Sequence, residues 1–395
     1  MNGRESGPDL VVTGAGLYGL TIAERAANEL GLRVLIIERR AHLGGNVYSD
    51  TDPDTGIEVH RYGSHIFHCS DETVWNYVNR FSAFNNYRHH IQTVHRGRMF
   101  AIPVNLATLC AFYGRSLSPA EARALVAEAA AEMNGRPPRN LEEKAVSAMG
   151  RPLYEALIRG YTRKQWDADP RDLPPEIIAR LPVRFDFNTR YFNDPYEGVP
   201  LSGYGALLSR MAAHPSIEVR LNTDFFAVRD SLPAHPLLVY TGPLDRYFEF
   251  RCGRLGWRAV RFEREVVQTG DYQGNSIVNY ADESVPWTRI HEFRHYHPER
   301  RYAPDRSVIF REFSCLPSAD ADPAYPIRNP ANLAIFNAYR SLAAAEKATI
   351  FGGRLGSYRY LDMHQIIGAA LNCFETKIRP FFQGRGIASG IDAYA

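Results

Sequence analysis

Cysteine is scarce in this sequence, and the few residues present do not form pairs. The chain has five cysteines, an odd number, dispersed without any C-x-x-C motif. This distribution is typical of free thiols in a reducing compartment and argues against a disulfide framework or a zinc site. No apolar run reaches the ~18 residues that a membrane-spanning helix needs, and residues 1–8 are polar. We therefore expect a cytoplasmic protein with no signal peptide and no membrane insertion.

Charge of one sign is not in excess either. The chain carries 46 lysine and arginine residues against 44 aspartate and glutamate residues, which gives a formal net charge of +2. Proteins that coat nucleic acid are usually strongly basic, so we expect no nucleic-acid partner, although a local basic pocket stays compatible with this balance. The length of 395 residues exceeds one ordinary core, so two or three domains are expected.

The first informative feature is a glycine-rich turn between a strand and a helix. An apolar run at 9–13 is followed by G-A-G-L-Y-G, which contains Gly14, Gly16 and Gly19, and then by a helical pattern. In this context G-x-G-x-x-G lets the backbone approach a pyrophosphate at the N-terminus of the helix. Glu38 ends the next strand-like run, where a carboxylate can bind a ribose. These features predict a β-α-β dinucleotide-binding unit that opens a parallel sheet.

Two more glycine-rich segments favour FAD over NAD. A G-G-N sequence at 44–46 follows Glu38 closely, as in FAD proteins of the glutathione-reductase and amine-oxidase type. The segment F-G-G-R-L-G-S-Y-R-Y-L-D-M-H at 351–364 predicts a late strand and a helix that begins near Asp362. The N-terminus of that helix could stabilise negative charge on a reduced isoalloxazine. No second G-x-G-x-x-G follows a strand, so no separate NAD domain is expected.

The rest of the chain changes character twice. From about 105 to 166 the pattern is helical, with a capping box at Ser118 and Glu121. From Ile217 onward strand-like runs separated by Gly, Pro and Asp predict an antiparallel sheet, at 217–226, 237–242, 257–267, 275–282, 287–296 and 306–314. We expect an α/β protein with a Rossmann-like FAD-binding domain (1–82, 200–247 and 330–395), a helical domain (83–160) and an antiparallel-sheet substrate domain (161–199 and 248–329).

One motif suggests a metal but lacks the right context. H-E-F-R-H at 291–295 matches the zinc-protease signature, which requires a helix so that both histidines share one face. The flanking residues are strand-like, and on a strand His291 and His295 would lie about 13 Å apart, too far for one ion. His65 and His68 also lack a matched ligand set. We therefore expect no metal site.

The segment 180–198 concentrates arginines and aromatic rings without a helical or strand period. It contains Arg180, Arg184 and Arg190 together with Phe185, Phe187, Tyr191, Phe192 and Tyr196. One interpretation is a surface loop with incidental charge. The other is a site for a flat anionic ligand such as a nucleoside diphosphate.

Five long motifs, taken together and in this order, resemble the UDP-galactopyranose mutase family. They are GIEVHRYGSHIFH at 56–68, RPLYEALIRGYTRKQW at 151–166, ARLPVRFDFNTRYFNDPYEG at 179–198, VNYADESVPWTRIHEFRH at 278–295 and GGRLGSYRYLDMH at 352–364. The resemblance extends from about 9 to 374. It implies a flavoprotein that interconverts UDP-galactopyranose and UDP-galactofuranose, an isomerase that uses reduced FAD. In this chemistry N5 of the flavin attacks the anomeric carbon and displaces UDP, and the resulting adduct opens the sugar ring.

The resemblance also implies roles for individual residues. Arg180 and Arg289 would act in catalysis by binding both phosphates and stabilising UDP as a leaving group, and His65 would lie beside the flavin. Tyr191 would stack on uracil. The other residues expected to bind substrate are Tyr161, Thr162, Trp166, Phe187, Asn279, Tyr325 and Tyr360. The residues expected to bind FAD are Gly14, Gly16, Gly19, Glu38, Arg39, Gly45, Asn46, Arg354, Asp362 and Met363. The implied partners are a UDP-sugar, an electron donor for the flavin, and a second copy in a homodimer.

Three positions depart from the pattern that the family usually shows. Ser64 stands where Pro or Ala is usual, Cys69 replaces Thr, and Trp287 replaces Tyr or Phe. Because Ser64 precedes His65, the same ring contraction on an N-acetylated or deoxy nucleotide sugar is an alternative. An amine-oxidase-like flavin oxidoreductase is another, although it would not need Arg180 and Arg289. A non-enzymatic nucleotide-sugar binder would be expected to have lost flavin-site residues, which are all present.

Overall fold

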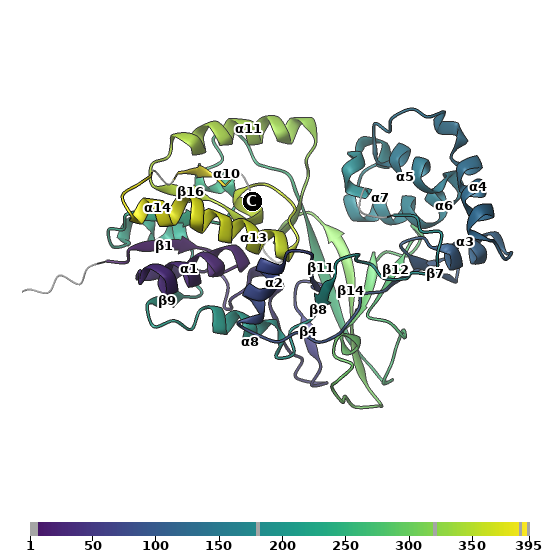
Figure 1. Ribbon diagram of the computed structural model, residues 1–395, viewed down its shortest axis with the longest axis horizontal. Coiled ribbons are helices and arrows are strands. Elements are labelled where there is room, and N and C mark those ends of the chain that lie inside the picture. Colours follow the sequence, from purple (N-terminus) through teal and green to yellow (C-terminus); the bar gives the residue numbers. More distant parts are fainter. Residues whose placement is uncertain (1–6, 179–181, 319–321, 387–388, 393–395) are drawn as a thin grey trace, which may run out of the picture.

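The computed structural model describes residues 7–178, 182–318, 322–386 and 389–392 and contains two large sheets (Figure 1). The first is a six-stranded sheet in the order β17-β16-β10-β1-β2-β9, and every neighbouring pair in it is parallel. Its strands are β1 (Leu10–Thr13), β2 (Val34–Ile37), β9 (Ile217–Arg220), β10 (Leu237–Tyr240), β16 (Thr349–Phe351) and β17 (Gly390–Ile391). The parallel sheet predicted from the first β-α-β unit is confirmed.

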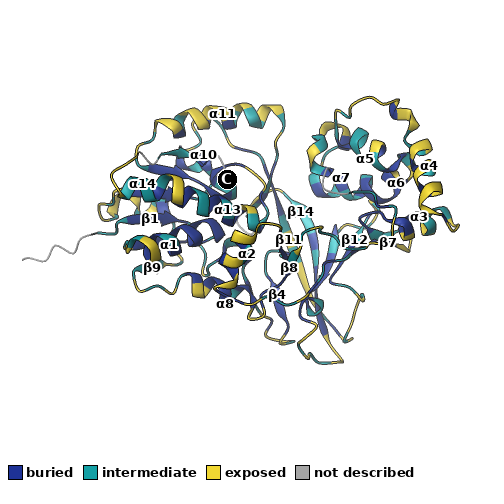
Figure 2. Ribbon diagram, in the orientation of Figure 1, coloured by how far each residue is buried: buried dark blue, intermediate teal, exposed yellow. Residues whose placement is uncertain are grey.

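Helices cover both faces of this sheet, as its fully buried central strands require. Alternate residues of β1 enter different cores: Val12 packs with α1 (Leu17–Leu30) and α13 (Met363–Cys373), whereas Val11 packs with α10 (Leu244–Tyr247) and α11 (Pro330–Ala345). The helices turn their buried sides toward the sheet and their exposed sides outward (Figure 2).

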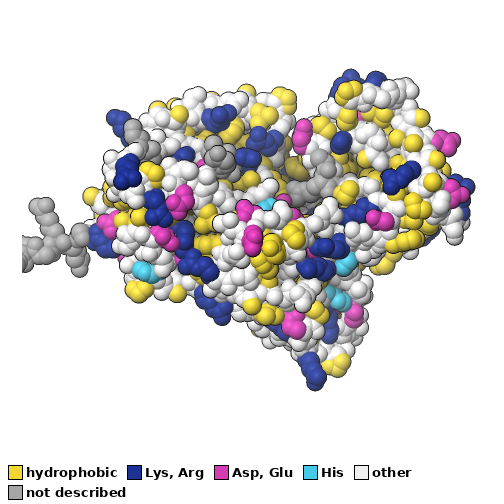
Figure 3. All heavy atoms as spheres, viewed as in Figure 1, with side chains coloured by type: hydrophobic (Ala, Val, Ile, Leu, Met, Phe, Trp, Pro, Cys, Tyr) yellow, Lys and Arg dark blue, Asp and Glu magenta, His cyan; other side chains and the backbone are white. Residues whose placement is uncertain are grey.

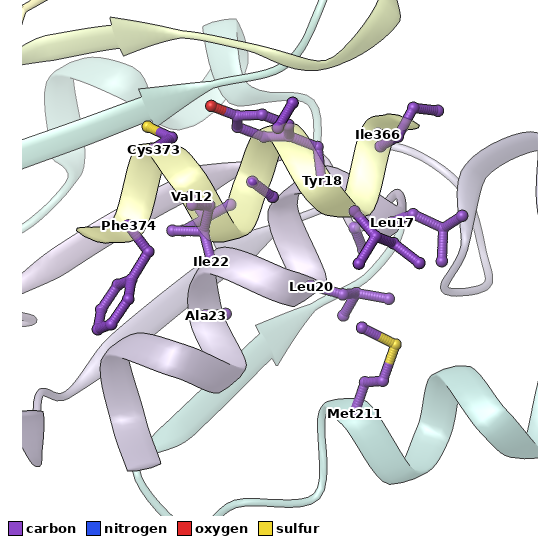
Figure 4. Packing of buried hydrophobic residues seen from close by; sticks show 14 of the residues in the cluster. Val12, Leu17, Tyr18, Leu20, Ile22, Ala23, Met211, Ile366, Cys373 and Phe374 are labelled. Carbon is purple, nitrogen blue, oxygen red and sulfur yellow. The ribbon is translucent and has the colours of Figure 1, made fainter. Parts of the chain in front are cut away.

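Close packing of α1 against α13 holds the start of α1 at the edge of the sheet. Tyr18, Ile22, Ile366 and Phe374 interlock between the two helices (Figure 4). The buried Tyr18 hydroxyl donates to Asp392 Oδ2 at 2.8 Å. The helix that follows the glycine turn is therefore anchored by the C-terminal part of the chain.

The second sheet has seven strands in the order β15-β11-β14-β13-β12-β6-β7. All its pairs are antiparallel except β12 with β6. The strands are β6 (Ile91–His95), β7 (Arg98–Ile102), β11 (Trp257–Val267), β12 (Ile277–Tyr280), β13 (Arg289–Glu292), β14 (Ser307–Cys315) and β15 (Pro323–Pro326). Two small sheets, β3 (Ser49–Thr51) with β4 (Glu58–His60) and β5 (Phe67–Cys69) with β8 (Tyr196–Gly198), accompany the two large ones.

A group of helices packs at the far end of the second sheet (Figure 1). It comprises α3 (Leu106–Tyr113), α4 (Pro119–Ala129), α5 (Leu141–Met149), α6 (Arg151–Leu153) and α7 (Gly160–Trp166), with a π-helical turn at Tyr154–Arg159. Both bonds of the predicted capping box are present between Ser118 and Glu121. The remaining α-helices are α2 (Glu72–Asn79), α8 (Gly203–Met211), α9 (Phe225–Val228), α12 (Gly353–Gly356) and α14 (Arg379–Phe382).

Three expectations from the sequence need correction. The runs that begin at 217 and 237 belong to the parallel sheet, not to the antiparallel one, and the first of them ends at Arg220 before the short helix α9. β6 and β7 lie within 83–160, where only helices were expected, because they extend the second sheet beside β12. The expected strand at 287–296 ends at Glu292, and a 3-10 turn follows.

All five cysteines are free. Over the part of the chain that the structure describes, no helix is both long and apolar enough to cross a bilayer.

Candidate active site

A cleft of about 360 Å³ lies at the carboxyl ends of β1, β2 and β10. This is the edge at which open α/β sheets bind ligands. Of the residues expected to bind FAD, seven line this cleft: Gly14, Gly16, Glu38, Arg39, Gly45, Asn46 and Arg354. The cleft is of the size usual for a small-molecule site.

The glycine turn has the backbone geometry that its sequence predicts. Gly14 has φ +97°, and a Cβ at this position would lie 2.2 Å from Thr241 Oγ1. A Cβ on Gly19 would lie 2.1 Å from the Gly14 carbonyl oxygen, so helix and strand meet there. A Cβ on Gly16 would meet no atom within 4 Å. Gly16 therefore leaves open space at the N-terminus of α1, where an anion can approach the backbone.

The second glycine pair closes against the first turn. The Gly44 N–H donates to the Ala15 carbonyl oxygen at 2.7 Å, and Gly16 and Gly44 form a parallel bridge. Glu38 is 7% exposed, and its carboxylate accepts from the Ala15 N–H and the Arg40 N–H, both at 2.8 Å. These contacts fix the carboxylate at the cleft.

The other end of the cleft leads to a row of aromatic and basic side chains. Arg354 lines the cleft, and its guanidinium lies over the Tyr360 ring at 4.8 Å. Tyr360 stacks on Tyr325 with ring centroids 5.6 Å apart, and Trp166 lies 6.2 Å beyond Tyr325. Arg354 Nε is buried without a hydrogen-bond partner. Asp362 and Met363 stand at the start of α13, whose Ile366 lines the cleft.

Arg289 lies at the start of β13 with its side chain 20% exposed. Its Nε is 3.1 Å from Glu312 Oε1, and its Nη2 donates to the Tyr161 hydroxyl. Burial alone would raise the pKa of Glu312, but the charge of Arg289 and the hydrogen bond from His291 outweigh burial and lower the pKa to about 2. Burial lowers the pKa of Arg289, but the charge of Glu312 and the neighbouring tyrosines together raise it above its usual value. Both groups are therefore charged at neutral pH.

Two other predicted substrate residues lie near Arg289. Asn279 on β12 pairs in register with Arg289, and its Oδ1 is buried without a hydrogen-bond partner. Thr162 is buried on α7 beside Tyr161. A buried amide without a partner is a position where a polar ligand gains binding energy.

In the segment 182–198, most of the rings and arginines are packed against the protein and one ring is exposed. The Tyr191 N–H donates to the His89 carbonyl oxygen at 2.7 Å, and its half-buried ring meets Phe192 edge-on. Phe187 is 68% exposed. Arg184 donates to Asn193 Oδ1 and Arg190 to Glu197, so both arginines have structural roles. Arg180 lies outside the described residues.

His65 is oriented by its own turn. Its Nδ1 lies 2.7 Å from the Gly63 carbonyl oxygen, so Nδ1 carries the proton and Nε2 is left as an acceptor. Burial lowers the pKa of His65 to about 4, and the charge of nearby Arg354 acts in the same direction. His65 is neutral at physiological pH and lies near the Arg354 end of the cleft.

The two histidines of H-E-F-R-H have different surroundings. His291 contacts Ser64 and Glu312, whereas His295 lies 3.2 Å from Asp271. Asp271, Glu292 and His295 bring ligand atoms within 4.8 Å of one another. Glu292, however, already accepts hydrogen bonds from two backbone N–H groups and from the Ser307 hydroxyl.

Sequence reasoning missed Glu312. It stands in the run V-I-F-R-E-F of β14, where Arg311 is partly exposed and Glu312 is buried. A carboxylate on the buried face of an apolar strand indicates a charged partner. That signal was present in the sequence, but the partner, Arg289, becomes evident only once β13 and β14 pair.

Two family models and several relatives match this chain. A sequence model of the UDP-galactopyranose mutase family matches residues 156–360, and one of NAD(P)-binding Rossmann-like domains matches residues 12–81. A probable UDP-galactopyranose mutase of Klebsiella pneumoniae is 41% identical over 92% of this chain and 93% of its own length. A dTDP-fucopyranose mutase of Escherichia coli is 36% identical over 94% of this chain and 98% of its own length.

Solved structures show the same fold. A reduced UDP-galactopyranose mutase superposes with a TM-score of 0.70 at 16% identity, over 92% of this chain and 95% of the other. A structure described as a putative protoporphyrinogen oxidase from Exiguobacterium gives a TM-score of 0.63 at 14% identity, over 93% of this chain and 98% of the other. At these identities the likeness concerns the fold alone.

Proposed function

The chain belongs to the UDP-galactopyranose mutase family, and we propose that it binds FAD and interconverts UDP-galactopyranose and UDP-galactofuranose. The observation that carries this proposal is the continuous row from the dinucleotide cleft to Arg289. The row begins at Arg354 and crosses Tyr360 to Tyr325, where the charge of Arg289, which bonds Tyr161, is felt. A cofactor in the cleft and a diphosphate at Arg289 would therefore face each other.

The residues around the cleft fit FAD. The space beside Gly16 suits a pyrophosphate, which the N-terminus of α1 would stabilise through free N–H groups. Glu38 would bind the adenosine ribose. Arg354, with its unpartnered Nε, would contact the flavin. Neutral His65 would present Nε2 as an acceptor beside it.

The substrate would bind along the aromatic row. Arg289, together with Arg180, would hold the diphosphate and stabilise UDP as it leaves. Glu312 at Nε and Tyr161 at Nη2 would orient the Arg289 guanidinium for this role. The hydroxyls of Tyr325 and Tyr360 would donate hydrogen bonds to the phosphates. Tyr191 would stack on uracil, and the free Asn279 oxygen would accept from a substrate N–H or hydroxyl. The bound, reduced flavin supplies a nucleophilic N5 for the anomeric carbon of the sugar.

The remaining parts of the proposal rest on the family resemblance. They are the roles of Trp166, Thr162, Phe187 and the FAD ligands named above, the three-part domain division, a cytoplasmic homodimer, and a separate electron donor. Figure 3 shows that the surface is indented between the part that carries α11 and the helical group. This indentation is compatible with entry of a nucleotide sugar between those parts.

A second candidate keeps the chemistry and changes the sugar to a deoxy sugar. The 36% identity to a dTDP-fucopyranose mutase supports it, as does Ser64, which replaces an apolar family residue beside His65.

The test uses purified protein whose flavin is reduced with dithionite under nitrogen. UDP-galactopyranose, UDP-galactofuranose and dTDP-fucopyranose are offered separately, and the products are separated by chromatography. We expect interconversion of the two UDP-galactoses in the reduced sample and none in an oxidised control. Conversion of dTDP-fucopyranose alone would instead establish the second candidate. No conversion of any of the three, by protein that holds FAD and binds UDP, would refute both.

A further inference from the structure

A row of polar contacts, two hydrogen bonds and one ion pair, connects Ser64, in the turn before His65, to the Arg289 guanidinium. Ser64 Oγ lies 2.6 Å from His291 Nδ1. His291 Nε2 lies 3.0 Å from Glu312 Oε2, and Glu312 Oε1 lies 3.1 Å from Arg289 Nε. The row draws on three separate parts of the chain: the turn after β4, β13 and β14.

The chemistry of the partners fixes the direction of each bond. Glu312 is ionised and can only accept, so His291 Nε2 must carry the proton. His291 Nδ1 is then an acceptor, and the Ser64 hydroxyl donates to it. The Ser64 oxygen in turn accepts from the Tyr296 hydroxyl. The hydrogen-bond directions at Ser64, His291 and Glu312 are therefore fixed, and Arg289 Nε faces Glu312 as an ion pair.

Packing as well as hydrogen bonding joins the turn to Glu312. Gly63 has φ +90°, and a Cβ on it would lie 3.1 Å from Phe262 Cζ and 3.7 Å from Glu312 Oε2. His291 is 1% exposed and stacks on Phe293. Because little space is left, loss of the Ser64 hydroxyl would leave His291 Nδ1 buried and unpaired. The imidazole, no longer held at Nδ1, would fix Glu312 less firmly and leave the carboxylate to its contacts with Thr288 and Arg289.

We propose that Ser64 and His291 are positioning residues, which hold Glu312 and thereby set the Arg289 guanidinium for the substrate diphosphate. This inference rests on the proposed function. It explains why a serine stands at a position where the family usually has an apolar residue: the hydroxyl is needed here because His291 faces it. The row also couples the turn that carries His65 to the diphosphate site.

The test compares UDP affinity among variants of the purified protein, measured by titration calorimetry without turnover. We expect Ser64→Ala to weaken UDP binding about tenfold and Ser64→Thr, which restores the hydroxyl, to stay within about twofold of the unaltered protein. His291→Gln should weaken binding at least as much as Ser64→Ala. Flavin content should stay unchanged in all three, because the row does not line the dinucleotide cleft.

Ser307→Ala is the matched control. It removes a buried hydroxyl–carboxylate hydrogen bond of β14, that of Ser307 to Glu292 at 2.7 Å, which is not part of the row that leads to Arg289. It should lower the melting temperature about as much as Ser64→Ala while UDP affinity stays unchanged.

Two results would count against the inference in different ways. Unchanged UDP affinity in Ser64→Ala, beside normal binding by the unaltered protein, would overturn the positioning role and leave the proposed function standing. Equal loss of affinity in Ser64→Ala and Ser307→Ala would show a merely structural effect and overturn it too. No UDP binding by the unaltered protein would overturn the proposed function and this inference together.

Discussion

Replacing either of two glycines of the same turn by alanine should have opposite consequences. In Gly16→Ala the new Cβ meets no protein atom within 4 Å, and φ −72° with ψ 176° suits any residue. In Gly19→Ala the new Cβ would lie 2.1 Å from the Gly14 carbonyl oxygen and 3.0 Å from Val12 Cγ1. The Cβ is fixed to the helix backbone and the oxygen belongs to the backbone of the turn, so neither can rotate away. The helix and the turn must therefore move apart.

The contacts set the expected size of each effect. Gly19→Ala gains about 1 kcal/mol of helix propensity but loses about 2–3 kcal/mol to overpacking, so the free energy of unfolding should fall by about 1–2 kcal/mol. Gly16→Ala should change it by less than about 0.5 kcal/mol, because a weaker helix cap and a stiffer unfolded chain nearly cancel. The Gly16→Ala methyl would occupy the space proposed for the pyrophosphate. Loss of one charge-assisted hydrogen bond there, about 1.5–3 kcal/mol, would weaken FAD binding ten- to hundredfold.

The assay measures thermal unfolding of the flavin-free proteins and the quenching of FAD fluorescence on rebinding. We expect Gly16→Ala to melt with the unaltered protein and to bind FAD poorly, whereas Gly19→Ala should melt earlier. Normal FAD affinity in Gly16→Ala would refute the reasoning, because the open space at the start of α1 would then not be the pyrophosphate site.

Three further predictions follow from the site and its surroundings. Arg289→Ala should lower turnover by about 10²–10³-fold and also lower the melting temperature, because Glu312 stays buried without its cation. Adding Glu312→Gln should restore the melting temperature but not turnover. If the two substitutions instead changed the melting temperature additively, the pairing of Arg289 with Glu312 would be contradicted. Tyr191→Ala should weaken UDP binding by about 1–3 kcal/mol by calorimetry, whereas Tyr191→Phe should not, and equal affinities would remove the ring from the uracil site. Burial raises the pKa of Glu58, but His297 and its other partners lower it from 4.5 to about 2, so the ionised carboxylate stabilises the fold fully above pH 4.5 and ceases to do so as the pH falls toward 2. In urea unfolding, Glu58→Gln should therefore remove roughly 3 kcal/mol of the fall in unfolding free energy between these pH values. An unchanged pH profile would contradict the low pKa.

Features determined by neighbouring residues could be predicted from the sequence. The glycine turn and the capping box at Ser118 and Glu121 are of this kind, since a short local sequence specifies each, although Gly14 also packs against the distant Thr241. The sheet to which β9 belongs could not be predicted. As an edge strand of the parallel sheet, it alternates half-buried and exposed residues, which imitates an antiparallel strand.

The candidate site shows the same division. The family resemblance indicated Arg289, Tyr325 and Tyr360 as substrate residues. Their partners could not be assigned from the sequence, because Ser64 was noted only as a departure from the family pattern and Glu312 was missed. Glu312 and Ser64 come together only through strand pairing and a turn, over separations that no local pattern records. The exposed position of Phe187 likewise depends on how its segment packs.

The central claim is that the bond between the anomeric carbon and UDP breaks while UDP stays in the site. UDP-galactopyranose carrying a heavy oxygen isotope in the bridge between sugar and phosphate tests this directly, with phosphorus NMR to locate the label. With dithionite-reduced protein, the account predicts that the label spreads from the bridge into the non-bridging oxygens of the β-phosphate, and that it stays in place with oxidised protein. Formation of the furanose with the label still wholly in the bridge would contradict the account.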